Sequence, residues 1–298
     1  MERERRIPNA KQVERKVKAF RFLSSMFGQI SMSLSGGRRG KELYLDTQQG
    51  RVRVLTYGFD NKETRPLYIN LHGGGFVLGS PEMEDRYLPG LAEAAGVKII
   101  SIDYSLAPEA PFPVALNQSY AVASYAKEHA KELGIDPARI GMGGQSAGGN
   151  LSAAVCLMDA EQKELNLKCL VLVYPPLDLY TDPINKPVVK GAISPKMARL
   201  FDAAYVGDRS RARDPLISPY YASPEQLRSF PPTLVITAEL DSLAPEAEAF
   251  VEKLREAGVT VALRRFEGAR HGFNVRGDPG TDESWQLVAA HLRKHLQP

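Results

Sequence analysis

Short apolar runs alternate with helix-forming stretches along most of this 298-residue chain, and this alternation limits its fold more than any other feature. The runs have the length of strands, and the stretches between them are long enough for helices. Alternation of this kind predicts the α/β class, a mostly parallel sheet with helices on both faces. We expect about eight strands, over residues 43–47, 51–59, 66–71, 97–104, 139–143, 167–174, 233–238 and 259–266. We expect helices over residues 85–95, 115–133, 147–160, 243–257 and 282–296.

Two segments depart from the alternation. Residues 1–21 contain eight basic and three acidic side chains. In and just after this segment, apolar residues recur at helical spacing, at Val13, Val17, Phe20, Leu23 and Phe27. This pattern predicts amphipathic helices that either pack on the protein, which we favour, or lie on a membrane surface. Residues 176–225 contain repeated Pro and Asp, a helical piece near 195–205 and no strand signal, which is typical of a functional insertion.

Composition excludes several classes of protein. The net charge of +3 is too small to indicate nucleic-acid binding. The two cysteines, Cys156 and Cys169, lack metal-ligand spacing and are expected to be buried free thiols, so we predict no metal site. The charged start of the chain is not a signal peptide, and no apolar run reaches the ~18 residues of a membrane span. A cytoplasmic protein without stable membrane association is therefore expected.

The pentapeptide Gly144-Gln145-Ser146-Ala147-Gly148 is the strongest motif in the chain. It follows a predicted strand and precedes a predicted helix, which is the context of a nucleophile elbow with Ser146 as the nucleophile. Gly144 and Gly148 allow the sharp turn that exposes the serine hydroxyl, and the helix directs its positive end toward the same point. The alternative is a glycine-rich turn, such as one that binds phosphate.

A second glycine-rich segment, His72-Gly73-Gly74-Gly75, follows the predicted strand 66–71. Consecutive glycines expose backbone N–H groups, and acyl transfer needs such donors where the tetrahedral oxyanion forms. We expect the oxyanion hole to consist of amides from Gly73, Gly74 and Gly75 with that of Ala147, Gly73 being the weakest candidate. His72 is expected to be structural. The alternative is a flexible turn.

A serine nucleophile needs a general base and a carboxylate that orients the base. Of the five histidines, His129 lies in a charged helix, while His291 and His295 lie four residues apart on the last helix and are expected at the surface. His271, in the loop after the last predicted strand, remains as the base. Asp241 follows the strand 233–238, at the end where active-site groups collect in parallel sheets. From the residues alone, Glu239 remains a competitor, and Asp241 could instead cap the following helix.

These motifs resemble those of the hormone-sensitive-lipase family of esterases, which have the α/β-hydrolase fold. The resemblance covers about residues 66–275 in the family's order and rests on residues 72–76, 103–109, 144–150, 174–175, 238–241 and 271–273. It implies Asp241 as the acid, with Glu246 at a flanking acidic position. Two positions differ: Gln145 stands where the family usually has Asp, and Ser105 where it usually has Arg.

The resemblance also implies a division of the chain. Residues 1–42 and about 176–225 form a helical cap, and the catalytic domain spans 43–298 with the second cap segment inserted. Apolar cap residues are then candidates for the substrate pocket beside Phe76, unless they only pack cap against core: Met26, Phe27, Ile30, Met32, Met197, Leu200, Phe201 and Tyr205.

The function implied is that of a serine carboxylesterase for short- to medium-chain acyl esters, with a Ser-His-Asp triad and no cofactor. Its expected partner is a small ester substrate, and a homodimer would fit the family. Cleavage of lactones or amides, or transfer of the acyl group to an alcohol, uses the same residues and remains an alternative. A non-enzymatic receptor on this scaffold is a further alternative. The related plant hormone receptors lack the catalytic His, so the presence of His271 argues against the receptor alternative.

Overall fold

The computed structural model describes residues 11–19, 21 and 39–297. An eight-stranded sheet has the order β1-β2-β4-β3-β5-β6-β7-β8 and confirms the expected strand count. The strands are β1 (Lys41–Thr47), β2 (Gly50–Tyr57), β3 (Arg65–Leu71), β4 (Lys98–Ile102), β5 (Ile135–Gln145), β6 (Cys169–Val173), β7 (Thr233–Leu240) and β8 (Val261–Arg270). β2 runs antiparallel to β1 and β4, and the other neighbours are parallel. The fold is that of an α/β hydrolase.

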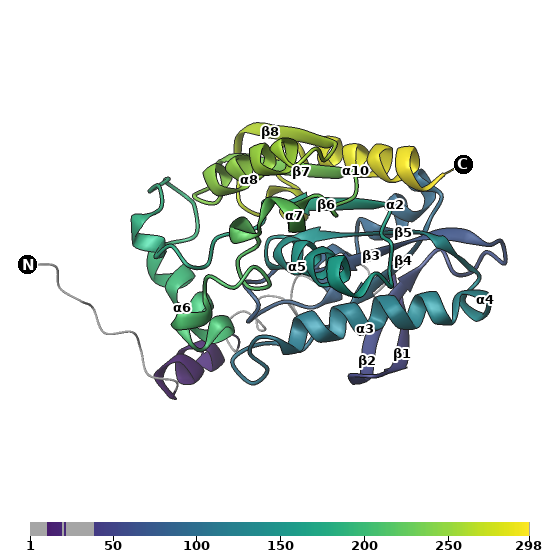
Figure 1. Cartoon of the computed structure of the whole chain (residues 1–298), viewed down its shortest axis with the longest axis horizontal. Coiled ribbons are helices and arrows are strands. Elements are labelled where there is room, and N and C mark those ends of the chain that lie inside the picture. Colours follow the sequence, from purple (N-terminus) through teal and green to yellow (C-terminus); the bar gives the residue numbers. More distant parts are fainter. Residues whose placement is uncertain (1–10, 20, 22–38, 298) are drawn as a thin grey trace, which may run out of the picture.

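Helices cover both faces of the sheet (Figure 1). They are α2 (Leu88–Ala95), α3 (Val114–Glu128), α4 (Ala130–Leu133), α5 (Ala147–Gln162), α8 (Ala244–Glu256), α9 (Phe273–Arg276) and α10 (Thr281–Leu296), with the 3₁₀ turn η1 (Pro81–Glu84). α2 and α10 bury apolar side chains in one core layer, and α3, α5 and α8 bury theirs in the other. Burial on both faces explains why β4 and β6 are apolar or small at nearly every position rather than alternating.

Three element boundaries differ from the sequence prediction. The helix expected over 115–133 is interrupted at His129, which separates α3 from α4 and packs its ring against Tyr125. β5 begins at Ile135 rather than near residue 139, and β8 continues to Arg270 rather than ending near residue 266. Both extensions consist largely of exposed or polar residues, so they carry no apolar signal.

The carboxyl ends of the parallel strands collect the residues that the sequence singled out. His72 follows β3, Ser146 follows β5, Asp241 follows β7, and His271 follows β8. Since β3, β5, β6, β7 and β8 are parallel, these ends meet at one edge of the sheet. The fold therefore brings together residues that lie up to 199 positions apart (271 − 72).

The insertion 176–225 lies at this edge and consists of helical pieces, with no strand in any of its residues. They are η2 (Pro183–Asn185), α6 (Pro195–Val206), η3 (Arg209–Arg211), η4 (Pro219–Tyr221) and α7 (Pro224–Leu227). The helical residues 11–19 lie at the same end of the molecule as α6 (Figure 1). Val13 and Val17 are buried in the core, and Arg21 donates to the Val77 carbonyl. For these residues the favoured packing alternative is confirmed.

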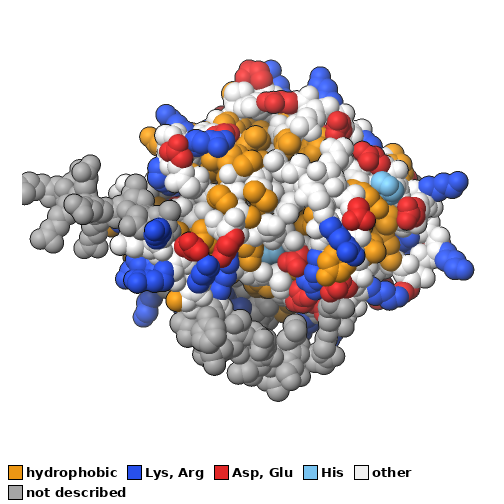
Figure 2. Space-filling model, turned by 90° about the horizontal axis from the view of Figure 1, so that it is seen from below, with side chains coloured by type: hydrophobic (Ala, Val, Ile, Leu, Met, Phe, Trp, Pro, Cys, Tyr) orange, Lys and Arg blue, Asp and Glu red, His pale blue; other side chains and the backbone are white. Residues whose placement is uncertain are grey.

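The surface charges and the state of the cysteines agree with what the composition predicts. On the face shown in Figure 2, the described residues intersperse basic and acidic side chains without a continuous field of either sign. Within the described ranges, no helix combines the length and apolar character needed to cross a membrane. Cys156 and Cys169 are buried free thiols, as predicted.

Candidate active site

Ser146 occupies a strained backbone position between β5 and α5. Its φ of 52° and ψ of −118° are values that a non-glycine residue rarely adopts. The Ser146 amide donates to the Val173 carbonyl of β6 at 2.8 Å, which anchors the turn to the sheet. The side chain is therefore fixed above the end of the strand, at the N-terminus of α5.

Close backbone packing explains the glycine two positions after the serine. A Cβ at Gly148 would overlap the carbonyl oxygen of Leu71, the last residue of β3. Any larger residue there would separate α5 from β3 and displace the turn that carries Ser146. Gly148 is thus required for packing, which is a separate need from exposing the hydroxyl.

His271 joins the serine to the acid. Its Nε2 lies 2.9 Å from Ser146 Oγ, and its Nδ1 lies 2.7 Å from Asp241 Oδ2. The Asp241 side chain is fully buried and that of His271 nearly so. Asp241 Oδ1 also accepts the Leu243 amide at 3.1 Å, so the carboxylate orients the histidine and caps the turn before α8 at once. This is the hydrogen-bonded arrangement of nucleophile, base and orienting acid.

The competing residues have other partners. Glu239 accepts the Gly268 amide at 2.7 Å and so ties β7 to the β8 strand. His291, predicted at the surface, is partly exposed and partly buried beside Pro232, and burial lowers its pKa to about 4. Residues 11–19, 21 and 39–297 contain no group of three side chains arranged to bind a metal ion.

The glycine loop presents backbone amides beside the serine. The N–H groups of Gly74, Gly75 and Ala147 donate to no acceptor in the described part of the chain. The Gly73 amide instead lies near the buried carboxyl of Glu84 and lowers its pKa. The amides of Gly74, Gly75 and Ala147 are therefore free to donate to a ligand, whereas the Gly73 amide has a different neighbour.

The buried His72 side chain stabilises the conformation of the glycine loop. Its ring is buried and stacks on Tyr104 at a centroid distance of 4.1 Å, and its Nδ1 lies 2.8 Å from the Gly73 carbonyl, to which it donates. The Tyr104 hydroxyl in turn donates to the His72 carbonyl at 2.7 Å. Burial lowers the pKa of His72 to about 4, so the ring is neutral. It holds the loop and does not reach Ser146.

A cavity of about 240 Å³ opens beside Ser146 and is mostly apolar. Phe76 and Phe201 line it, as do Leu179 and the segment 186–189 of the insertion. The Phe201 ring lies against Gly75, where an added Cβ would overlap it. The cavity therefore lies between the glycine loop and the insertion.

Several predicted pocket residues do not line this cavity. Tyr205 is fully buried and stacks on Phe76 at 3.8 Å, so its assignment to the pocket is wrong: it supports a residue that lines the cavity. Met197 and Leu200 also do not line it, because the cavity-facing side of α6 carries Ala198 and Phe201. The predicted pocket residues Met26, Phe27, Ile30 and Met32 lie outside the described residues.

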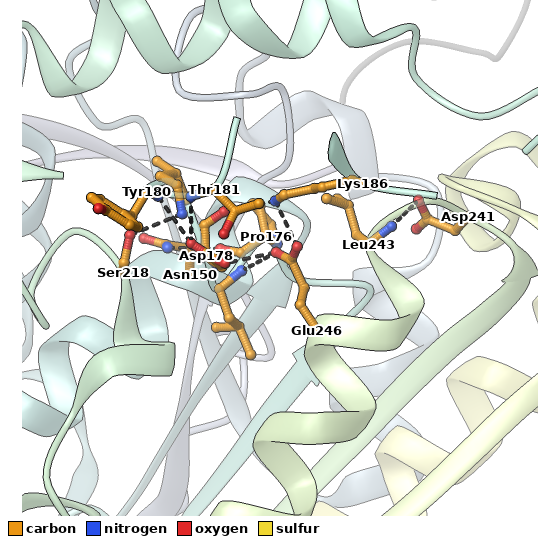
Figure 3. A network of polar contacts seen from close by, with 12 residues as sticks. Asn150, Pro176, Asp178, Tyr180, Thr181, Lys186, Ser218, Asp241, Leu243 and Glu246 are labelled. Atoms are coloured by element: carbon orange, nitrogen blue, oxygen red, sulfur yellow. Dashed lines mark hydrogen bonds and ion pairs between the residues drawn. The ribbon is translucent and has the colours of Figure 1, made fainter. Parts of the chain in front are cut away.

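A polar network connects the insertion to α8 (Figure 3). Glu246 accepts the amides of Leu177 and Asp178 through Oε1 and forms an ion pair with Lys186 at 2.5 Å through Oε2. Lys186 also donates to the Asp178 carbonyl at 2.6 Å. The flanking acidic residue implied by the sequence resemblance thus fixes the loop after β6 and one wall of the cavity.

Sequence reasoning missed three polar residues near the site. Lys186 and Asp202 line the cavity from the insertion, and Glu84 is fully buried beneath the glycine loop. Each lies in a segment whose local pattern is that of an exposed loop or helix. Their burial results from tertiary packing, and no local signal in the sequence reveals it.

The two residues that depart from the family pattern both have uncharged side chains. Ser105 and the Gln118 side chain bond each other reciprocally, at 2.8 and 3.0 Å. Gln145 is buried, and its Oε1 has no hydrogen-bond partner among the described residues. An amide and a hydroxyl thus stand where the family usually has an acid and a base, and the Ser146–His271 contact is present at 2.9 Å.

The fold and this site together define a hydrolase with a serine at a strand-to-helix turn. A family model described as the alpha/beta hydrolase fold matches residues 68–275, and the chain belongs to that family. An arylesterase of Saccharolobus solfataricus is 33% identical over 273 residues, 88% of this chain and 84% of that protein. The carboxylic ester hydrolase LipN of Mycobacterium tuberculosis is 34% identical over 267 residues, 85% of this chain and 70% of that protein.

Solved structures show the same relationship. A thermostable esterase from Pseudomonas putida matches with a TM-score of 0.86 at 30% identity, covering 95% of this chain and 91% of that one. A hyperthermophilic esterase from Pyrobaculum calidifontis matches with a TM-score of 0.84 at 30% identity, covering 96% and 95%. The resemblance to the hormone-sensitive-lipase esterases is thereby confirmed.

Proposed function

We propose that this enzyme, a carboxylic ester hydrolase, cleaves short- to medium-chain acyl esters through a Ser146–His271–Asp241 triad and an acyl-enzyme. The observation that carries the proposal is the continuous chain of contacts, 2.9 Å from Ser146 Oγ to His271 and 2.7 Å from His271 to Asp241. Two of the relatives, an arylesterase and a carboxylic ester hydrolase by name, support the same reaction class.

In the acylation step, His271 Nε2 takes the hydroxyl proton while Ser146 Oγ attacks the ester carbonyl. The amides of Gly74, Gly75 and Ala147 stabilise the oxyanion, and Asp241 stabilises the imidazolium. His271 then protonates the leaving alcohol. In the second step His271 activates water, which releases the acid and restores Ser146. Apart from the ester and the water, the groups that act in these steps are side chains and backbone amides of this chain.

The size of the cavity supports the proposed chain length. About 240 Å³ lies below the roughly 300–1,000 Å³ of pockets for drug-sized ligands. Its walls are largely apolar, which suits a short alkyl chain.

We further propose that residues 1–42 and 176–225 act as the cap, because part of each lies at the sheet edge that carries the triad. The free buried thiols of Cys156 and Cys169 support a cytoplasmic location. A homodimer stays a prediction.

Hydrolysis of p-nitrophenyl esters from acetyl to palmitoyl tests the proposal. We expect the largest kcat/KM among short and medium chains and a steep fall toward palmitoyl. Ser146→Ala should lose activity by a factor on the order of 10⁶, as for other serine triads. Equal activity of the variant and the wild type would refute the nucleophile. A folded wild-type protein that hydrolyses no ester would instead favour the receptor alternative.

A further inference from the structure

Asp202 places a carboxyl group in the wall of the substrate cavity. It lies on α6 one helical turn after Ala198 and next to Phe201, which both face the cavity. Asp202 is partly exposed, and it lines the cavity that also reaches Ser146. An acidic residue in a mostly apolar substrate cavity requires a physical explanation, because removing a charge from water is costly.

This carboxyl has no hydrogen-bond or ion-pair partner within the part of the chain that the structure describes. The neighbouring acids of the insertion differ: Asp182 is paired with Arg199, and Asp178 and Asp208 accept backbone amides. Burial raises the pKa of Asp202 to about 7. The fold thus maintains an unpaired, poorly hydrated carboxyl beside the reacting groups, where a ligand could satisfy it.

Lys186 faces the same space. It lines the cavity, and its charge is the one that most strongly opposes the rise in the pKa of Asp202. The two groups are nevertheless too far apart for an ion pair. The ammonium of Lys186 uses two of its three N–H donors on the Asp178 carbonyl and Glu246 (Figure 3), which leaves the third for a ligand.

We propose that Asp202 and Lys186 together bind a hydroxyl group of the substrate, so that the preferred esters carry a hydroxyl on the acyl or the alcohol chain. This inference rests on the proposed esterase function. A hydroxyl can donate to Asp202 and accept from Lys186 at the same time. A methyl group leaves both polar groups unsatisfied, an ammonium is repelled by Lys186, and a carboxylate is repelled by Asp202.

The test compares esters that differ only in one terminal group. On the alcohol side, 3-hydroxypropyl butyrate is compared with butyl butyrate. On the acyl side, ethyl 6-hydroxyhexanoate is compared with ethyl heptanoate and ethyl 6-aminohexanoate, and kcat/KM is measured in a pH-stat. We expect the wild type to prefer the hydroxyl ester of one series over its alkyl counterpart by on the order of tenfold.

Two variants assign the preference to the cavity. Asp202→Leu should abolish the hydroxyl preference, so that its kcat/KM for 3-hydroxypropyl butyrate no longer exceeds that for butyl butyrate. Asp208→Asn, which changes an exposed acid two residues after α6, should retain the preference. Thermal unfolding verifies that each variant is folded. If Asp202→Leu does not fold, the kcat/KM ratios of the wild type for hydroxyl and alkyl esters decide the question alone.

Three results would overturn the inference: no hydroxyl preference in either series, a larger preference for the amino ester, or an unchanged ratio in folded Asp202→Leu. The proposed function fails separately, if Ser146→Ala still hydrolyses butyl butyrate. A flat hydroxyl ratio in an enzyme that depends on Ser146 would therefore reject only the role of Asp202.

Discussion

Glu84 should make the stability of this protein fall as pH rises through neutrality. The residue ends η1 beneath the glycine loop, has 0% exposure, and neither carboxyl oxygen has a hydrogen-bond partner among the described residues. Burial raises its pKa from 4.5 to about 8, although the nearby amides of Gly73 and Asn70 offset part of the rise. Between these two values the folded protein holds a proton that the unfolded chain has released.

The sign and size of this pH dependence of stability follow from proton linkage. Because the folded state binds the additional proton, stability decreases with rising pH by about 1.4 kcal/mol per unit. Over 8 − 4.5 = 3.5 units this amounts to about 5 kcal/mol. The contribution is fully present below pH 4.5 and is lost by about pH 8.

Glu84→Gln removes this titration and preserves the shape of the side chain. Urea unfolding of both proteins between pH 5 and 8 gives the free energy of unfolding at each pH. The difference between variant and wild type should grow with pH at the slope above, whereas Glu256→Gln at the exposed end of α8 should follow the wild type. Parallel curves for Glu84→Gln and the wild type would refute the reasoning.

The remaining predictions concern the acid, the ion pair and the core. Asp241→Asn should lower kcat for p-nitrophenyl butyrate by roughly 10⁴, because the histidine loses its orienting carboxylate. Glu239→Gln should leave kcat near the wild-type value, and equal losses in both would contradict the assignment of the acid. Lys186→Met leaves the Glu246 charge unpaired where both side chains are only 10% exposed, so the free energy of unfolding should fall by roughly 3–5 kcal/mol in urea titrations. Adding Glu246→Gln should restore part of that loss, and no recovery would argue against the pair. Leu292→Ala in α10 should cost roughly 2–5 kcal/mol by the same assay without changing kcat at 25 °C, and an unchanged denaturation midpoint would contradict its place in the core.

The sequence predicted the sheet and the triad for different physical reasons. The strands were visible because burial on both faces makes them continuous apolar runs, as in β4 and β6. The residues of the proposed triad could be identified because each follows a strand and the fold collects the strand ends. From the residues alone Glu239 competed with Asp241. The structure separates them, because Glu239 bonds the Gly268 amide while Asp241 contacts His271.

The cavity was less predictable. Phe201 and Tyr205 are aromatic residues one helical turn apart on α6, yet only Phe201 lines the cavity, because Tyr205 is fully buried against the ring of Phe76. Asp202 and Lys186 occur in a charged, Pro-rich segment whose composition is that of a solvated loop. Their positions in the cavity wall depend on how the insertion packs against α8, which local periodicity does not contain.

Labelling with a fluorophosphonate tests the central claim most directly, because it detects an activated serine without a choice of substrate. The protein is treated with the reagent, digested, and the modified peptide is identified by mass spectrometry. We predict a single adduct on Ser146, much slower labelling of His271→Ala, and none of Ser146→Ala. Labelling of Ser146→Ala at the wild-type rate, or an adduct on a different serine in the wild type, would contradict the proposed mechanism.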